Sequence, residues 1–224
     1  MARTKLDDRK LPDYTRGEEI FNMVTHIVGG AMGIVALVLC IIVSVKHNNG
    51  YGLFSSIIYG VSMILLYTMS SIYHGLSPKL KAKKVFQIFD HCSIFILIAG
   101  TYTPILLCSV LPVDPMWAWI LFALVWIVTI LGITLNAIDI ESHAVFSMIC
   151  YLALGWCIIL KFNLVVSTLG TTGLWLLVIG GVAYTIGTIF YGLEKKYRYM
   201  HSIWHIWILI GSLLHFLCII LYVL

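Results

Sequence analysis

Two histidines stand four residues apart in His201-Ser-Ile-Trp-His205, at the start of the last apolar stretch of the chain. On a helix, side chains at positions i and i+4 lie one above the other, so both imidazoles can reach one cation. Imidazole is a common zinc ligand, but two ligands do not complete a zinc site. The rest of the chain must therefore supply further ligands at the same depth.

Three further side chains are candidates for the same site. His74 closes the segment Ser70-Ser-Ile-Tyr-His74, which ends the second apolar stretch, and Ser70 lies one helical turn before it. Asp90 is the one acidic residue embedded in apolar sequence at the start of a stretch. An acidic side chain at mid-depth in a membrane costs roughly 2.5–3.5 kcal/mol, so its presence there indicates a function. A structural pairing of Asp90 with a loop lysine is the alternative.

Three histidines with one open position are the ligand pattern of a catalytic zinc ion, whereas a structural zinc site has four protein ligands. A zinc ion lowers the pKa of a bound water to about 7, which supplies a nucleophile at neutral pH. We therefore predict that His74, His201 and His205 bind Zn²⁺. Asp90 is predicted to contact the metal through water as a general base, and Ser70 to hydrogen-bond the polarised substrate oxygen. A zinc ion that only joins the helices is the alternative.

The composition places this site in a membrane. Of the 224 residues, 61% are hydrophobic and 11% are charged, with a mean hydropathy of +1.00. Soluble proteins are about 45–50% apolar and about 25% charged. We predict an all-α, polytopic membrane protein with a cytosolic segment 1–23 and a seven-helix transmembrane domain 24–224. Its predicted spans, each long enough to cross a bilayer, are 24–45, 52–73, 92–110, 116–135, 144–162, 173–192 and 203–224.

The basic residues predict how these helices are oriented. Five of them precede the first span, four lie between the second and third, and three lie between the sixth and seventh, whereas Lys46 and Lys161 lie on the opposite side. Because basic residues favour the cytosol, we predict a cytosolic N-terminus and an external C-terminus. The net charge of +4 therefore reflects topology and requires no nucleic-acid partner. The following basic residues are predicted to lie in a solvated loop: Lys79, Lys81, Lys83 and Lys84.

Local signals predict how some helices begin and pack. Thr15 and Glu18 match a capping box, so a helix is predicted to start near residue 16. Gly29 and Gly33 have the spacing that lets two membrane helices approach closely. Pro104 predicts a kink in its helix. The six cysteines lie in or at the ends of apolar stretches without metal-type spacing, so we expect them to pack as small apolar residues.

The remaining histidines have no assigned ligand role. His215 lies ten residues beyond His205, which is about 15 Å along a helix, so it cannot bind the same ion. A group in the connection between the fourth and fifth spans is expected to be solvated or to rim an entrance; it consists of Asp139, Glu141 and His143. The roles of His26 and His91 are left open.

Several segments of the chain form a recognisable combination: Glu18-Glu-Ile-Phe-Asn22-Met-Val-Thr25-His26, Ser70-Ser-Ile-Tyr-His74, Phe89-Asp90-His91, Gly100-Thr-Tyr-Thr-Pro104, and His201-Ser-Ile-Trp-His205 through Gly211-Ser212 and His215-Phe216. Together they resemble the haemolysin III family, the bacterial branch of the progestin and adiponectin Q receptor family. This resemblance implies a seven-helix protein of a bacterial cell membrane, with zinc held by three histidines and an aspartate on the zinc-bound water. The wider group includes alkaline ceramidases, which implies hydrolysis of a lipid amide.

Three functions are compatible with these observations. The first is a zinc-dependent hydrolase that cleaves a lipid amide or ester and so affects membrane lipid homeostasis. The second is a pore-forming haemolysin, which the resemblance implies, although the fourth to sixth spans carry no pore-lining charge. The third is a sensor of the membrane state with a structural zinc ion. Membrane lipids are the expected partners, and assembly of identical chains is left open.

Overall fold

A computed structural model describes residues 4–224, and the regular structure in this part of the chain is entirely helical. Arg3, one of the basic residues counted above, lies outside the described residues. The predicted all-α class is confirmed. The long helices are α1 (Arg16–Lys46), α2 (Gly50–Gly75), α3 (Lys81–Pro104), α4 (Pro115–Ile138), α5 (Ile140–Trp156), α6 (Phe162–Leu193) and α7 (Met200–Tyr222). Three short helices complete the structure: η1 (Leu6–Asp8), η2 (Ile105–Val110) and η3 (Cys157–Lys161).

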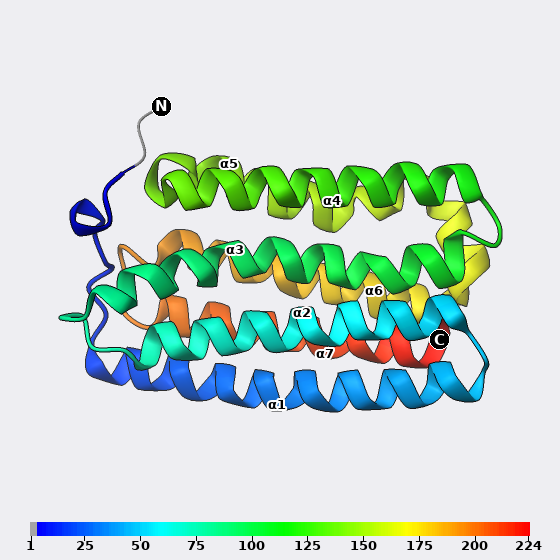
Figure 1. The fold of residues 1–224 in the computed structure, drawn as a ribbon, viewed down its shortest axis with the longest axis horizontal. Helices are drawn as coiled ribbons and strands as arrows, with labels where there is room; N and C mark the ends of the chain where they lie inside the picture. Colours follow the sequence, from blue (N-terminus) through cyan, green and yellow to red (C-terminus); the bar gives the residue numbers. More distant parts are fainter. Residues whose placement is uncertain (1–3) are drawn as a thin grey trace.

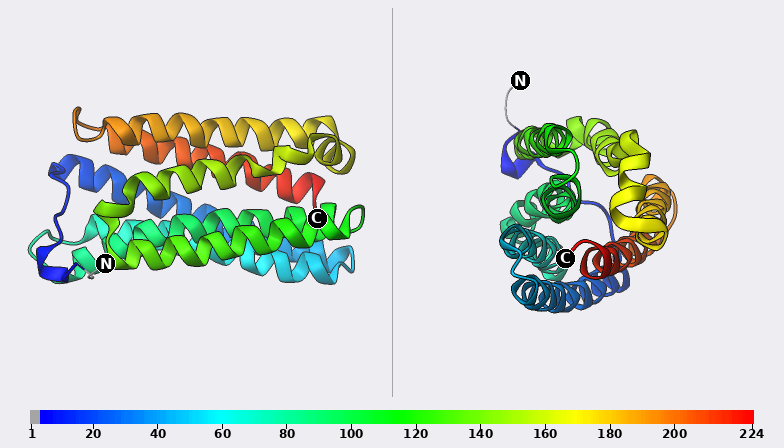
Figure 2. Two further views of the ribbon diagram at one scale, coloured as in Figure 1. Left: turned by 90° about the horizontal axis from the view of Figure 1, so that it is seen from above. Right: turned by 90° about the vertical axis from the view of Figure 1, so that its right-hand side faces the viewer.

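Six helical segments of the described residues are long and apolar enough to cross a membrane. The fifth of them is 54 residues long, Ile140–Leu193, and contains α5, η3 and α6. Figure 2 shows that the chain reverses direction between α5 and α6, so this segment covers two of the predicted spans. The chain is a multi-pass membrane protein; the count of seven spans and the orientation stay predictions.

The helices follow one another around a ring. Each helix packs beside the next one in sequence, and α7 returns to contact α1, as the end-on view in Figure 2 shows. In Figure 1 the N-terminal segment and the α2–α3 and α6–α7 connections lie at one end of the bundle, and the C-terminus lies at the other. The end of α2 and the start of α7 therefore meet at the same end.

The first helix begins where the capping signal predicts. The Thr15 hydroxyl accepts the Glu18 backbone N–H at 3.3 Å, and Glu18 Oε2 accepts the Thr15 N–H at 2.8 Å. The other Glu18 oxygen accepts the backbone N–H of Tyr199 at 2.7 Å, just before α7 starts. Glu18, which helps to satisfy the backbone groups at the start of α1, thus also holds the turn that leads into α7.

Helices α1 and α2 approach closely at the two predicted glycines. A Cβ atom on Gly29 would lie 2.4 Å from the Tyr67 ring, and one on Gly33 would lie 3.1 Å from Ile64. The buried Tyr67 hydroxyl donates to Ser212 of α7 at 2.7 Å. The small residues of α1 therefore make room for a ring that also links α2 to α7.

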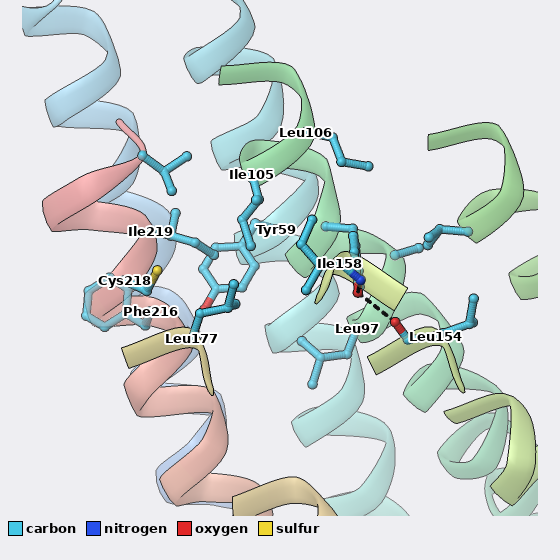
Figure 3. Packing of buried hydrophobic residues seen from close by; sticks show 14 of the residues in the cluster. Tyr59, Leu97, Ile105, Leu106, Leu154, Ile158, Leu177, Phe216, Cys218 and Ile219 are labelled. Carbon is cyan, nitrogen blue, oxygen red and sulfur yellow. Dashed lines mark hydrogen bonds between the residues drawn. The ribbon is translucent and has the colours of Figure 1, made fainter. Parts of the chain in front are cut away.

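Figure 3 shows part of the apolar core, to which α1 to α7 contribute buried side chains. Buried Tyr102 donates its hydroxyl to the carbonyl of Leu154 at 2.7 Å and accepts the N–H of Ile158 at 3.1 Å, where α5 gives way to η3. At Pro104 α3 ends and the chain continues as the π-helix η2, whereas the predicted kink stays a prediction. All six cysteines are free and buried or half-buried, as expected for packing residues.

We predict that Gly29→Ala destabilises the protein whereas Gly30→Ala does not. The new methyl group at position 29 would overlap the Tyr67 ring, and such overpacking costs about 1–3 kcal/mol. At position 30 the nearest atom lies 3.9 Å away, which is ordinary contact. Thermal unfolding of both variants in one detergent provides the measurement. Equal melting temperatures would contradict the close approach of α1 and α2.

Candidate metal centre

The structure brings together the three histidines that the sequence analysis selected. His74, at the end of α2, is 3% exposed, and His201 and His205, at the start of α7, are 4% and 0% exposed. One ring nitrogen from each lies within 4.8 Å of the other two. The ring centroids are 5.3 Å apart for His74 and His201, and 5.0 Å apart for His74 and His205. This buried group has the geometry to hold a metal ion.

The pattern of hydrogen bonds fits a metal at this position. The Nε2 atoms of His74, His201 and His205 are all buried and have no hydrogen-bond partner within residues 4–224. Each Nδ1 atom, by contrast, has a polar neighbour. A buried nitrogen without a partner costs free energy, and one metal ion would satisfy all three at once. Three imidazoles suit zinc, as well as copper, iron and nickel.

The Nδ1 atom of His74 is held by an acidic residue of α1. It lies 2.7 Å from Glu19 Oε2. The second Glu19 oxygen lies 2.8 Å from the Nζ atom of Lys83, at the start of α3. A carboxylate on Nδ1 fixes the tautomer that leaves Nε2 free for a metal, and outer partners of this kind orient metal ligands generally.

His201 is held from two directions. Its Nδ1 atom lies 2.5 Å from Glu194 Oε2, just after α6, and 2.9 Å from the Tyr14 hydroxyl. Tyr14 donates to the same Glu194 oxygen at 2.8 Å. Burial, with the nearby Glu194 carboxylate, raises the pKa of Tyr14 well above its usual value. Burial alone would raise the pKa of Glu194, but its interactions with His201 and Tyr14 lower that pKa overall. Glu194 therefore accepts as a carboxylate and Tyr14 donates as a phenol.

The third ligand, His205, faces α1. Its Nδ1 atom lies 3.4 Å from the Thr25 hydroxyl, which donates its own hydrogen to backbone carbonyls of its helix. The His26 ring stacks on the His205 ring, with centroids 3.6 Å apart and an interplanar angle of 9°. Both nitrogens of His26 are buried without a partner. His26 thus lies beside the metal-binding group without belonging to it.

The sequence motifs do not identify the hydrogen-bond partners of the three histidines. The sequence motifs indicate no role for Glu19 or Glu194, and Lys83 is predicted to lie in a solvated loop. That expectation for Lys83 is wrong, because its side chain is 2% exposed and points into the bundle from the first turn of α3. One signal was available in the sequence. Glu19, Asn22 and His26 lie at helical spacing, so α1 presents one polar face.

Asp90 and Ser70, the predicted catalytic residues, lie near this centre. Asp90 is 8% exposed and lines two cavities, one of about 570 Å³ and one of about 120 Å³. The larger cavity is also lined by Tyr14 and His201, whereas the smaller one is lined mainly by apolar side chains of α3, α5 and α6. The Ser70 hydroxyl is buried on α2, one turn before His74, and is close enough to Asp90 to interact with its carboxylate. Their catalytic roles stay predictions.

His215, His91 and His143 do not belong to the three-histidine group. His215 packs against Gly180, and its Nε2 atom lies 3.0 Å from the Leu177 carbonyl, in agreement with the distance argument above. His91 lines the larger cavity, and half-buried His143 contacts the backbone of its own helix start. The larger cavity is also lined by Asp139 and Glu141, so these two residues rim it.

Comparison with known proteins gives consistent relationships. Residues 14–216 match the family described as "Haemolysin-III related". The chain is 39% identical over 207 residues to "Hemolysin-3" of Bacillus cereus, covering 92% of each chain. It is 37% identical over 209 residues to "Hemolysin-3 homolog" of Bacillus subtilis (strain 168), covering 93% of this chain and 96% of the relative. Human "Monocyte to macrophage differentiation factor" is 26% identical over 167 residues, 72% of this chain and 67% of that protein.

The family match spans most of the chain and includes all three histidines of the metal-binding group. The two bacterial relatives are aligned over nearly their whole length, so the likeness is not limited to one helix. These matches agree with the resemblance that the sequence motifs indicate. The chain therefore belongs to the haemolysin III family of multi-pass membrane proteins.

Proposed function

We propose that the protein is an intramembrane zinc hydrolase that cleaves an amide or ester bond of a membrane lipid on the cytosolic side. Two observations on the same three histidines carry this proposal: one ring nitrogen of each lies within 4.8 Å of the other two, and their buried Nε2 atoms have no partner among the described residues. Three histidine ligands leave a coordination position open, which is typical of catalytic rather than structural zinc sites. Seven spans and a cytosolic N-terminus are part of the proposal.

The two cavities beside Asp90 support a lipid substrate. The larger is lined by polar and charged residues at the end of the bundle that holds the N-terminal segment, and it can take a polar head group. The smaller is lined largely by residues such as Ile94, Leu97 and Ile98 and can take part of a hydrocarbon chain. A substrate bound in both would place the bond between its two parts beside Asp90.

The side chains around the metal centre then have distinct roles. A bound zinc ion would supply a Lewis acid and a nucleophile at neutral pH. The Asp90 carboxylate takes the proton from the attacking water and returns it to the leaving amine or alkoxide. The Ser70 hydroxyl donates a hydrogen bond to the carbonyl oxygen as negative charge develops there. Glu19, Glu194 and Thr25 keep the ligand rings oriented.

Metal analysis of single variants tests the ligand set. Purified protein is expected to hold about one zinc ion per chain, because three donors surround one point. His74→Ala, His201→Ala and His205→Ala should each reduce the bound zinc to near zero in elemental analysis. His215→Ala is the control, since this half-buried histidine of α7 contacts the Leu177 carbonyl instead. A loss of zinc in the control equal to that in His205→Ala would contradict this ligand set.

Substrate turnover in Asp90→Asn tests the chemistry. We expect the release of fatty acid from a long-chain N-acyl amide, or from the matched ester, to fall by about 10²–10⁴-fold because the general base is lost. Zinc content should not change, since Asp90 lies outside the three-histidine group. Mass spectrometry of the released fatty acid provides the measurement. Undiminished turnover would exclude Asp90 as the base.

Two other functions remain candidates and predict different results. Pore formation is favoured by the name of the bacterial relatives. It predicts dye release from liposomes that Asp90→Asn and His74→Ala leave unchanged. A membrane sensor with a structural zinc ion predicts a large loss of thermal stability on metal removal, with no lipid consumed. Comparing the lipids of cells with and without the protein would identify an accumulating substrate, which only the hydrolase predicts.

The side of the membrane is tested with a chelator that cannot cross it. The basic connections α2–α3 and α6–α7 lie at the metal-binding end of the bundle, which the charge distribution puts in the cytosol. The chelator should therefore remove zinc from inside-out vesicles and leave right-side-out vesicles loaded. Zinc content after equal incubation gives the readout. Removal only from right-side-out vesicles would reverse the proposed orientation.

A further inference from the structure

Lys83 is buried although it belongs to a lysine cluster at the surface. Its side chain is 2% exposed, whereas that of Lys81, in the same helical turn, is 74% exposed. Lysine is almost never fully buried unless it is paired. The Lys83 ammonium has three contacts. It lies 2.8 Å from Glu19 Oε1, donates to the Tyr73 carbonyl at 2.8 Å, and lies 4.6 Å from the centre of the Tyr73 ring.

Two of these contacts converge on His74. Glu19 uses its other oxygen to hold the Nδ1 atom of His74 at 2.7 Å. Tyr73 directly precedes His74, and α2 ends at Gly75, so the Tyr73 carbonyl is among the last four of its helix, which have no partner within the helix. The ammonium therefore fixes both the side-chain partner of His74 and the backbone that carries it.

We propose that Lys83 is a positioning residue of the metal centre, which acts through Glu19 and the last turn of α2 to aim the Nε2 atom of His74 at the metal. The inference rests on the proposed metal site and adds to it a residue that controls the orientation of one ligand. Without the ammonium, one oxygen of the half-buried Glu19 carboxylate loses its partner, and the carboxylate is free to turn away from His74. The imidazole then loses the contact that sets its tautomer and orientation.

The residues that orient His74 form one arm of the site, and the residues that orient His201 form a second, separate arm. Glu194 and Tyr14 orient His201 from α6 and the N-terminal segment, whereas Glu19 and Lys83 orient His74 from α1 and α3. Groups that act through a shared partner have non-additive effects, and independent groups have additive ones. Combining variants within one arm and across both arms therefore distinguishes positioning from a general loss of stability.

The experiment measures metal affinity in the purified full-length chain. The protein is stripped with a chelator in detergent and titrated with Co²⁺, whose visible absorption reports the ligand geometry, and then with Zn²⁺ in competition. Lys83→Met keeps the length of the side chain and removes its charge, and it should weaken binding of both metals about 10–100-fold. Lys81→Met is the matched control and should bind as the wild type does. Melting temperatures without metal check that each variant is folded.

The double variants test the path of the effect. In the Glu19→Gln background, Lys83→Met should cause little further loss of affinity, because the partner through which it acts is already altered. In the Glu194→Gln background, the same substitution should cause its full loss. If Lys83→Met does not fold, Lys83→Gln, which retains a donor for the Tyr73 carbonyl, replaces it in the series.

The possible outcomes separate this inference from the proposed function. Wild-type affinity in Lys83→Met, with or without a lower melting temperature of the metal-free protein, would overturn the positioning role and leave the metal site intact. Full additivity of Lys83→Met with Glu19→Gln would also overturn it. Wild-type protein that binds neither Co²⁺ nor Zn²⁺ would overturn both the proposed function and the role of Lys83.

Discussion

A buried imidazole carries two nitrogen atoms, and each of them needs a partner when no water is available. Three such rings meet at one end of this bundle. Their Nδ1 atoms are held by Glu19, by Glu194 with Tyr14, and by Thr25, while the Nε2 atoms all remain free. The requirement to satisfy the three Nδ1 atoms therefore accounts for the polar groups that several helices and the N-terminal segment bring to this end.

The ring of helices makes this convergence possible. Because α7 closes the ring against α1, α1 can present Glu19 to α2 and Thr25 to α7. The same closure is reinforced by Glu18, which caps α1 and accepts the Tyr199 N–H before α7. Farther from this end of the bundle, close packing at Gly29 lets the Tyr67 hydroxyl reach Ser212. Helix packing and ligand positioning thus depend on the same contacts.

The surroundings of Asp90 differ on its two sides. One side faces a cavity with polar and charged residues near the N-terminal segment, and the other faces a narrower, mainly apolar cavity among α3, α5 and α6. An amphiphile satisfies both environments, whereas a fully polar molecule would leave the apolar cavity unfilled. This contrast, more than the family name, favours a lipid substrate over a conducting pore. The apolar lining also offers little stabilisation to ions in transit.

Much of this arrangement was predictable from one-dimensional features. Spans follow from the lengths of apolar stretches, and His74, Asp90, His201 and His205 fall at span ends that the basic residues assign to one side. The capping box and the glycine spacing act within or directly beside one helix, so they could also be recognised. Local chemistry and depth along a helix axis are properties that the order of residues determines.

The sequence by itself thus determined an all-helical membrane protein and the three histidines of its candidate metal centre. The tertiary structure alone decided which partner holds each histidine and that Lys83, unlike its neighbouring lysines, is buried. Periodicity shows which residues share a helix face but not how far each helix is rotated or which face it meets. Glu19 and His74 are 55 residues apart, and their contact exists only because α1 and α2 pack with those faces together.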